Sequence, residues 1–355
     1  MFEEMRRRKE ERNPAEKESS ERVSLKQLAA HLGLSPTTLS LVLNESPLAK
    51  TIPEVTRERI IAAAREFNYR PNYLARSLRA QRSFTLGVIV PEVSDGYSAM
   101  VLNGIEDHLL NEGYFYFVAS HRHRADLIEK YPKMLMDRRV EGLIAVDTPC
   151  HHLRGIPAVA VSGHDEVEGI TNIILDHDKA ADLALRHLVE LGHQQIAMLK
   201  GQDFSSDTEI RFKSIRKTAK QLGVQIKPRL IAELKGDSPS PELGYLATQQ
   251  LLMSREPFTA LFAFNDISAI GAIRAFREAG KRVPEDISVV GFDDIFSASF
   301  YYPSLTTVQQ PLQEMGKLAA RTVLERIARA PHSPYPKVLV VEPKLIIRQS
   351  TATAS

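Results

Sequence analysis

Apolar positions recur every three or four residues near the start of the chain, which is the spacing of short amphipathic helices. The first run follows Ser24 and consists of Leu25, Leu28, Ala29 and Leu32. Ser24 and Gln27 have the capping-box form, and Gly33 suits the left-handed turn that ends a helix. Ser35 and Pro36 then have the residue types of an N-cap and a first helical position. The pattern therefore predicts two short helices joined by a tight turn.

The second of these helices has an apolar face and a polar one. Its predicted buried positions are Leu39, Val42 and Leu43. Pro36, Thr37 and Ser40 point the other way, and Leu41 lies on the same side as Thr37. A third helical pattern over 53–67 completes a small core. Such a polar face is typical of a helix-turn-helix, whose second helix enters the major groove of DNA. Any small three-helix domain also has a face of this kind, so the pattern alone fits a plain structural unit as well.

From Thr85 onward, short apolar runs alternate with longer amphipathic stretches, which indicates βαβ units around parallel sheets. The predicted strands are 86–90, 115–119, 142–146, 158–161, 173–175, 196–199, 230–234, 260–264, 288–291, 306–309 and 338–341. The predicted helices include 100–110, 179–191, 208–222, 267–279 and 312–328. One sheet rarely holds so many strands, so we expect a doubly wound α/β body made of two similar lobes.

Composition places the chain among globular proteins. It has 355 residues, of which 43% are hydrophobic. No apolar run approaches the ~20 residues that a bilayer requires, and the charged stretch 1–20 lacks the apolar segment of a signal peptide. We expect residues 1–20 to form a disordered tail. Cys150 is the single cysteine, which fits a reducing compartment, so we expect a cytoplasmic protein with no membrane partner.

The formal net charge of +2 conceals an uneven distribution. Segment 21–82 carries ten Lys and Arg against five Asp and Glu, whereas segment 83–355 carries 30 against 33. A basic segment attached to a mildly acidic body suits binding to the phosphates of DNA. The same excess also fits a solvated basic surface, so the charge alone does not decide between the two.

Many stretches of the sequence resemble the lactose-repressor (LacI/GalR) family of transcription regulators. In the N-terminal part these stretches are 23–44, 56–60, 68–72 and 75–79. In the body they include 113–114, 139–144, 182–193, 264–267, 283–294 and 303–307. The resemblance implies a small all-α helix-turn-helix headpiece followed by an α/β, two-lobed, periplasmic-binding-protein-like (type I) effector domain.

The resemblance also implies a division of the chain. Residues 21–70 would form the headpiece, 71–82 a hinge helix, and 83–350 the effector-binding and dimerisation domain. The first lobe of that domain would comprise about 83–175 and 310–335, and the second about 176–309 and 336–350.

The helix-turn-helix pattern and the resemblance together assign the DNA contacts. In the headpiece the candidates are Ser24, Ser35, Pro36, Thr37, Thr38, Ser40, Leu41, Asn44, Tyr69 and Arg70. In the hinge they are Asn72, Ala75, Arg76, Leu78 and Arg79. The resemblance implies that the hinge folds on operator DNA, pairs with its copy in a homodimer and inserts Leu78 into the minor groove. Small Ala75 would let the paired helices approach closely.

Two features depart from the family pattern. Leu41 stands where the family usually has an arginine that reads guanine, and a leucine contacts at most a thymine methyl group. We therefore expect an operator that differs from the common one. The stretch 44–56 is also longer than the family pattern, and it either repositions the third helix or adds a DNA backbone contact through Lys50.

Ligands of doubly wound sheets bind beyond the carboxyl ends of the strands, so polar residues that follow a predicted strand are candidates for effector binding. Those that also match effector positions of the family are Tyr97, Arg211, Asn265 and Asp293. We add Ser98, which adjoins Tyr97. A converging carboxylate, amide and guanidinium suit a polyol or another small polar ligand, so we expect a sugar-like effector. Asp266 also follows a strand, but as the start of a helix it is more simply an N-cap.

Several other residues near these positions bear on what the cleft binds. The loop 202–207 differs from that of sugar and purine binders through Phe204 and the acidic Asp203 and Asp207, which leaves the effector chemistry open. His177, between two aspartates, resembles part of a ligand-side turn. The histidine pairs 121/123 and 151/152 have no carboxylate at ligand spacing. We therefore expect no metal, no cofactor and no catalytic residue.

Two other classes of protein share parts of this pattern. A periplasmic solute-binding protein would have the same body, but it would carry a signal peptide and no N-terminal helical module. An enzyme on a dinucleotide-binding sheet would carry a glycine-rich phosphate loop, a nucleophile elbow or a Walker sequence, and this sequence has none of the three. The sequence therefore favours a transcription regulator, and we expect it to be a repressor, with activation as the alternative.

Overall fold

The computed structural model describes residues 23–44, 46–69, 82–94, 96–153, 155–236, 240–329 and 333–354. The chain forms two compact units, Met1–Arg82 and Ser83–Ser355. The predicted tail 1–20 and the predicted hinge up to residue 81 lie outside the described residues.

Within its described residues, the N-terminal unit consists of α3 (Leu25–Leu32), α4 (Pro36–Leu43), the 3₁₀-helix η1 (Pro47–Thr51) and α5 (Glu54–Glu66). Ser24 and Gln27 form the predicted capping box, because the Gln27 amide donates to Ser24 Oγ (3.3 Å) and Gln27 Oε1 accepts from the Ser24 amide (2.7 Å). Gly33 ends α3 with a φ of 66°. The helices share a core of Leu28, Ala29, Leu39, Val42, Ala49, Ile60, Ala63 and Ala64. The predicted helix-turn-helix and third helix are confirmed.

The long stretch between α4 and α5 folds as η1. The Ala49 amide donates to the Ser46 carbonyl (2.8 Å), which closes the first turn. Ala49 is buried in the core of the unit, whereas Lys50 is exposed. The stretch therefore adds a turn that packs against α4, and its lysine stays on the surface.

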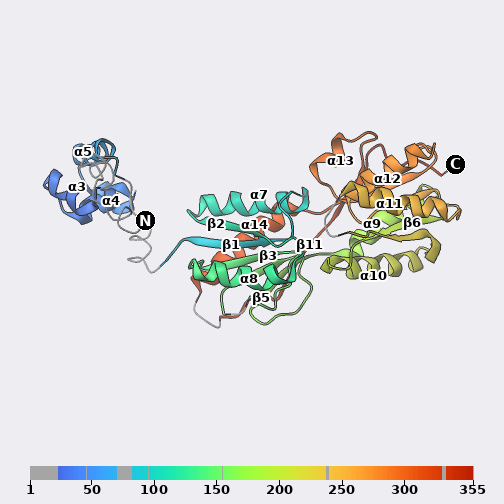
Figure 1. The fold of residues 1–355 in the computed structure, drawn as a ribbon, viewed down its shortest axis with the longest axis horizontal. Coiled ribbons are helices and arrows are strands. Elements are labelled where there is room, and N and C mark those ends of the chain that lie inside the picture. The colour runs from blue at the N-terminus through green and yellow to red at the C-terminus, as the bar shows by residue number, and fades with distance from the viewer. Residues whose placement is uncertain are drawn as a thin grey trace, which may run out of the picture. The chain divides into compact units, whose positions relative to one another are not determined.

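Two six-stranded sheets form the larger unit (Figure 1). The first has the order β11-β5-β4-β3-β1-β2 with every pair parallel. Its strands are β1 (Thr85–Val90), β2 (Phe115–Ser120), β3 (Gly142–Val146), β4 (Ala158–Val161), β5 (Ile170–Leu175) and β11 (Val338–Val341). The second has the order β12-β10-β9-β8-β6-β7, in which only the β10–β12 pair is antiparallel. Its strands are β6 (Ile196–Lys200), β7 (Ile231–Glu233), β8 (Ala260–Phe262), β9 (Ser288–Asp293), β10 (Thr306–Gln309) and β12 (Lys344–Ile346).

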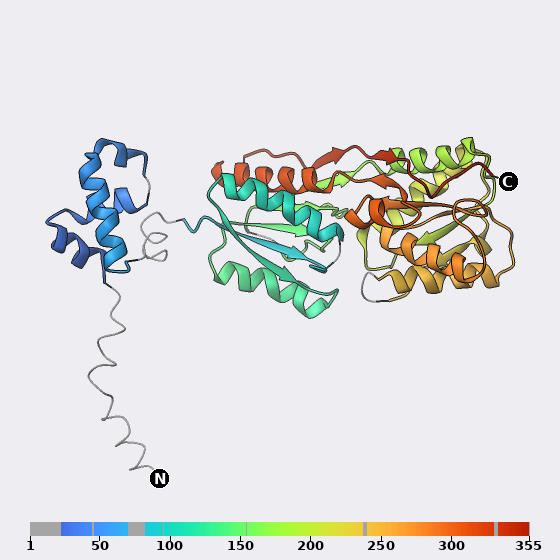
Figure 2. The same ribbon diagram turned by 90° about the horizontal axis from the view of Figure 1, so that it is seen from above.

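Helices cover both faces of each sheet. On the first sheet, α7 (Gly96–Asn111) and α14 (Leu312–Ala328) pack on one face and α8 (Ala125–Asp137) on the other (Figure 2). On the second, α11 (Pro241–Met253) and α12 (Asp266–Glu278) pack on one face, and α9 (His177–Glu190) and α10 (Ser206–Gln221) on the other. The short elements η2 (Pro228–Leu230) and α13 (Phe296–Phe300) complete the second lobe. None of the helices in the described ranges is both long and apolar enough to cross a membrane.

Strand β1 shows why the apolar runs are nearly continuous. Val88 and Val90 face α7 and α14, whereas Ile89 points to the opposite face and packs with Leu135 of α8. Successive side chains of a strand alternate between faces, so a strand covered on both sides must be apolar at every position. This pattern made the doubly wound body predictable, and the prediction is confirmed.

The chain passes between the lobes at three connections, from β5 to α9, from β10 to α14 and from β11 to β12. The division implied by the family resemblance has all of 336–350 in the second lobe. That placement was wrong for β11, because Val338 to Val341 pair with β5 in the first sheet. A short strand without a following helix carries no pattern that tells which sheet it joins. Strand β12 was not predicted.

Candidate functional site

The start of α4 is an exposed polar surface of the N-terminal unit. Ser35, Pro36 and Thr37 are exposed, whereas Leu39 is fully buried. Ser35 caps the helix, because its Oγ accepts from the Thr38 amide (3.1 Å), and its hydroxyl also forms a hydrogen bond with Thr38 Oγ1 (2.8 Å). Hydroxyl groups and backbone amides at a helix N-terminus are suited to contacts with base edges and phosphates.

The rest of α4 extends this surface. Ser40 and Leu41 are half-buried, and Asn44 is exposed just beyond the helix, where its Nδ2 donates to the Ser40 carbonyl (2.7 Å). Two other predicted DNA contacts have local structural roles, since Ser24 caps α3 and Tyr69 packs partly against the core. The remaining ones lie outside the described residues: Arg70, Asn72, Ala75, Arg76, Leu78 and Arg79.

A cleft lies between the two lobes of the larger unit, with an empty volume of about 620 Å³ that is partly open to solvent. The first lobe contributes Pro91, Tyr97, His123 and Asp147. The second lobe contributes Gln202, Phe204, Ser205, Asp207, Arg211, Phe264, Asn265, Ile267, Asp293 and Ile295. Four of the five predicted effector residues therefore line one cleft. The fifth, Ser98, is fully buried on α7 and does not line it.

Arg211 is held rigidly at the base of this cleft. Its guanidinium carbon lies 3.7 Å from the ring centroid of Phe292 and 4.5 Å from that of Phe264. Nη1 donates to the Phe264 carbonyl (2.6 Å) and Nη2 to Asp207 Oδ2 (2.9 Å). Its Nε is buried and has no hydrogen-bond partner within the described part of the chain. This buried donor therefore remains to be satisfied.

Two polar residues of the second lobe lie beside Arg211 in the cleft lining. Asn265 is the N-cap of α12, because its Oδ1 accepts from the Ser268 amide (2.9 Å), so its Nδ2 is the group left for a ligand. Asp293 ends β9 with a φ of 104°, and its Oδ1 accepts from Gln310 Nε2 (2.7 Å). Asp293 therefore has a carboxylate oxygen fixed by the protein at the end of a central strand.

Asp266 was expected to be the N-cap of α12, and this expectation was wrong, because Asn265 holds that position. Asp266 is fully buried, and its carboxylate accepts from the Ile295 amide (2.8 Å) and from Thr307 Oγ1 (2.6 Å). Burial and the negative charge of Asp293 raise the pKa of Asp266 well above its usual range. The residue anchors the segment after β9 to α12 and β10, which is a structural role that a local sequence pattern does not show.

Asp147 directly follows β3 and joins the lobes, and it was not among the residues predicted from the sequence. Its carboxylate accepts from Ser205 Oγ (3.2 Å) and the Ser206 amide (3.3 Å) of the second lobe. Burial and the charge of Asp207 raise the pKa of Asp147 to about 6. Nearby, the rings of His123 and Phe204 stack across the lobes with centroids 3.6 Å apart. The rule used for the other residues, a polar side chain directly after a strand, would have found Asp147.

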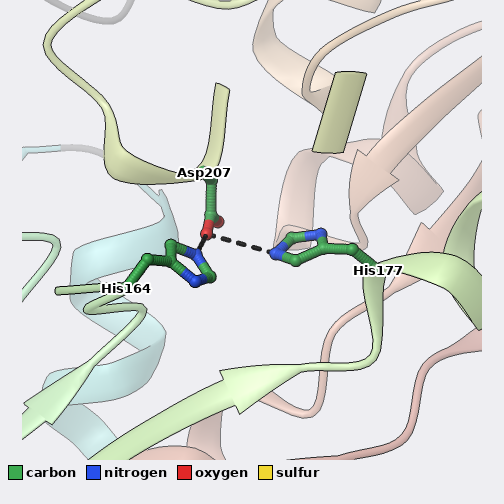
Figure 3. A group of neighbouring side chains, drawn as sticks. All are labelled: His164, His177 and Asp207. Carbon is green, nitrogen blue, oxygen red and sulfur yellow. Dashed lines mark hydrogen bonds and ion pairs between the residues drawn. The ribbon is translucent and has the colours of Figure 1, made fainter. Parts of the chain in front are cut away.

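Asp207 lies at the centre of a cluster that the sequence analysis also missed (Figure 3). His164 Nε2 lies 2.5 Å from Asp207 Oδ1, and His177 Nε2 lies 3.3 Å from the same oxygen. Arg211 Nη2 donates to the other oxygen, Oδ2. Burial by itself raises the pKa of Asp207, but hydrogen bonds from both histidines and the charge of Arg211 outweigh it and keep the pKa well below the usual range. Asp207 is therefore an ionised, buried carboxylate in the cleft.

The histidine pairs 121/123 and 151/152 do not belong to the cluster around Asp207. His151 is exposed and lies 3.2 Å from Asp165, so it has a carboxylate neighbour that its sequence surroundings did not reveal. His121 is buried, its Nε2 is 3.0 Å from Thr148 Oγ1, and burial lowers its pKa to about 4. Within the described residues, the one group with metal-ligand spacing is the cluster around Asp207.

The chain combines a helix-turn-helix unit with a two-lobed α/β unit that surrounds a polar cleft. This combination defines a DNA-binding regulator that responds to a small molecule. Comparison with known proteins gives the family. The profile of bacterial regulatory proteins of the lacI family matches residues 24–72, and that of the periplasmic binding protein-like domain matches 185–351. The chain belongs to the LacI family of bacterial transcription regulators.

Individual relatives agree with this assignment. The HTH-type transcriptional repressor PurR of Haemophilus influenzae is 31% identical over 338 residues, which cover 92% of this chain and 98% of the relative. The lac repressor dimer bound to operator and the anti-inducer ONPF superimposes with a TM-score of 0.81 at 29% identity, covering 94% of this chain and 100% of that one. A LacI family transcriptional regulator from Enterococcus faecium with bound ribose superimposes with a TM-score of 0.67 at 28% identity. The match covers 76% of this chain and 100% of that one.

Membership of this family establishes the general activity. The chain is a DNA-binding transcription regulator under the control of a small-molecule effector, and its relatives are regulators, not enzymes. The class of function and the fold class expected from the sequence are therefore confirmed.

Proposed function

We propose that this chain is a homodimeric, cytoplasmic transcriptional repressor whose affinity for operator DNA changes when a neutral, hydroxyl-rich metabolite binds in the interlobe cleft. The name of the Haemophilus relative supports repression, and the lac repressor dimer on its operator supports a dimer on DNA. The effector class rests on the charges and hydrogen-bonding groups of the cleft.

In this proposal α4 reads bases in the major groove. Exposed Ser35, Pro36 and Thr37 at its start, with Ser40 and Leu41 beside them, are the reading surface. Asn44 adds a polar contact at the far end. The hinge predicted from the sequence would pair with its copy, and Leu78 would enter the minor groove while Arg70, Asn72, Arg76 and Arg79 contact the backbone.

The convergence of Arg211, Asn265 and Asp293 on one cleft is the observation that carries the effector assignment. Arg211 Nε is buried without a hydrogen-bond partner among the described residues, and a small shift of the guanidinium toward the cleft would let a ligand oxygen accept from it. Asn265 Nδ2 offers a further donor, and Asp293 accepts from ligand hydroxyls. A molecule whose hydroxyl groups both donate and accept, such as a sugar, satisfies all three residues at once.

The electrostatics of the cleft disfavour anionic ligands. Asp147, Asp207 and Asp293 line it, and the single guanidinium of Arg211 is already paired with Asp207. A sugar phosphate or a dicarboxylate would therefore add negative charge to a site with excess carboxylates. The regulator with bound ribose is a relative whose ligand has the proposed chemistry.

Ligand binding would reach the DNA through lobe closure. The contacts of Asp147 with Ser205 and Ser206, and the stacking of His123 on Phe204, join the lobes at the cleft rim. A ligand between the lobes changes how they close, and in a dimer this sets whether the two hinge helices pair. Coupling of this kind typically amounts to about 1–3 kcal/mol.

The test begins with a thermal-shift screen of neutral sugars and nucleosides, with sugar phosphates and dicarboxylates as the opposing set. The ligand found is then titrated into operator complexes of the wild type, Asp293→Ala and Asp203→Ala. Asp203 is a matched control, because it is an exposed acid of the adjoining loop that does not line the cleft. We expect Asp293→Ala to lose the response while it still binds operator, and Asp203→Ala to keep both. An unchanged response in Asp293→Ala, or stabilisation by anions alone, contradicts the proposal.

A further inference from the structure

Three side chains with metal-binding atoms meet beside the cleft: His164, His177 and Asp207 (Figure 3). They come from three separate segments. His164 lies in the loop between β4 and β5 of the first lobe, His177 is the first residue of α9, and Asp207 lies in the first turn of α10. Because α9 and α10 belong to the second lobe, the cluster joins the two lobes.

The spacing of the three atoms is close to what a tetrahedral metal ion requires. His177 Nε2 is 3.3 Å and His164 Nε2 2.5 Å from Asp207 Oδ1, and all three atoms lie within 4.8 Å of one another. With bonds of about 2.0–2.1 Å, two ligands of a tetrahedral Zn²⁺ are about 3.3 Å apart. Small rotations of the His164 side chain would therefore bring all three atoms to bonding distance.

The surroundings shield and orient the cluster. The side chains of His164, His177 and Asp207 are 13%, 4% and 6% exposed. Arg211 Nη2 donates to Asp207 Oδ2 (2.9 Å), so the other oxygen, Oδ1, faces both imidazoles. Hydrogen bonds to the outer atom of a ligating carboxylate are the usual way in which proteins fix such a ligand.

His177 is poorly satisfied by the protein alone. Its Nδ1 is buried and has no hydrogen-bond partner in the described ranges, and its Nε2 makes the long contact of 3.3 Å with Asp207. A metal ion would replace the long contact of Nε2 with a direct bond, whereas Nδ1 lies on the other side of the ring and is not a ligand atom of this cluster.

We propose that His164, His177 and Asp207 bind one divalent transition-metal ion of the Zn²⁺, Ni²⁺ and Co²⁺ class. Two imidazole nitrogens with one carboxylate oxygen favour these ions over Mg²⁺ and Ca²⁺, which prefer sites made of oxygen atoms. The fourth position is left for water, because no other metal-binding side chain of the described residues joins the group. The ion clamps the first lobe to the second and is a second input to lobe closure, separate from the organic effector.

The experiment uses the full chain without an affinity tag, treated with chelator and titrated with Co²⁺. We expect one Co²⁺ per chain with the intense visible absorption of a four-coordinate ion, and displacement by Zn²⁺. His164→Ala and His177→Ala are expected to lower Co²⁺ affinity by about 100-fold or more, since loss of a ligand exceeds the 10- to 100-fold effect of losing an outer partner. His151→Ala is the control and should bind as the wild type, because His151 is exposed and lies outside the cluster.

A Zn²⁺-dependent rise in Tm tests the clamp between the lobes. It should appear in the wild type and in His151→Ala, and be lost in His164→Ala, whose missing ligand comes from the first lobe. Circular dichroism checks folding; if His177→Ala does not fold, His164→Ala and His164→Gln decide the result.

Three results would overturn the proposal. The first is no stoichiometric uptake of Co²⁺ or Zn²⁺ by the wild type, which leaves only a hydrogen-bonded cluster around Asp207. The second is equal Co²⁺ affinity in His164→Ala and the wild type, and the third is a Zn²⁺-dependent rise in Tm that His164→Ala retains. Metal uptake is measured without DNA or effector, so its failure does not affect the effector and operator assignments.

Discussion

The N-terminal unit and the interlobe cleft position their functional side chains in different ways. In the N-terminal unit, one helix of eight residues, α4, carries the proposed reading surface, and its buried side chains Leu39 and Val42 fix its orientation. In the cleft, Asp147, Arg211 and Asp293 come from separate elements of two lobes. DNA recognition therefore depends on local structure, whereas ligand recognition depends on how distant segments pack. Substitutions should separate the two activities cleanly.

The largest expected effect is that of Leu39→Ala. Leu39 is fully buried in a core of few residues, and such a truncation costs about 2–5 kcal/mol, which is comparable to the whole stability of a small domain. We expect loss of operator binding, measured by fluorescence anisotropy, with an unchanged ligand-induced shift in the Tm of the larger unit. Half-buried Leu41→Ala is the control and should leave the unit folded. Normal operator binding by Leu39→Ala would show that α4 is not held by this core.

Leu78→Ala tests the predicted hinge. Without the apolar wedge, the base step is not opened, so operator binding should weaken by up to a few kcal/mol while effector binding stays the same. Parallel titrations of operator and effector measure both. Equal losses in the two titrations would remove Leu78 from the DNA interface.

Leu41→Arg sharpens the comparison further, because it changes what α4 reads without changing its fold. An arginine at this half-buried position can donate two hydrogen bonds to guanine, worth about 1–3 kcal/mol of discrimination. Selection from random duplexes should then enrich guanine at one position of each half-site, relative to the wild type. An unchanged consensus would place Leu41 away from the bases.

The smallest expected effect concerns pH and the contact between lobes. The pKa of Asp147 is raised to about 6 by burial and the charge of Asp207, so the folded protein binds this proton more tightly than the unfolded chain. The resulting stability is fully present below the ordinary pKa of 3.8 and is lost as pH rises through about 6. Relative to Asp147→Asn, the wild type should lose about 1–2 kcal/mol of unfolding free energy between pH 5 and 7.5. Identical pH profiles from urea unfolding would contradict this.

The same contrast explains what could be predicted from the sequence. The capping residues Ser24 and Ser35 and the helix-ending Gly33 act over three or four residues, so the helix-turn-helix could be placed almost to the residue. The strands of the body were predictable because burial on both faces demands continuous apolar runs. The predicted ends of these strands differ from the observed ends by a few residues, because pairing with the neighbouring strand decides where each strand ends.

The cleft was predictable only in part. Arg211, Asn265 and Asp293 follow strands or match the family pattern, and they do line the cleft. The approach of His164 to Asp207, 43 positions along the chain, depends on the packing of two lobes and leaves no local signal. Ser98 was predicted wrongly because a helix turns adjacent residues by about 100°, so Tyr97 lines the cleft while Ser98 is buried.

The central claim is that occupancy of the cleft controls sequence-specific DNA binding. The most direct measurement selects an operator from random duplexes with the purified protein and titrates it with and without saturating effector. The account predicts an enriched consensus and an affinity that changes by roughly 5- to 150-fold on ligand binding. The absence of any sequence preference, or identical titrations with and without the ligand, would contradict it.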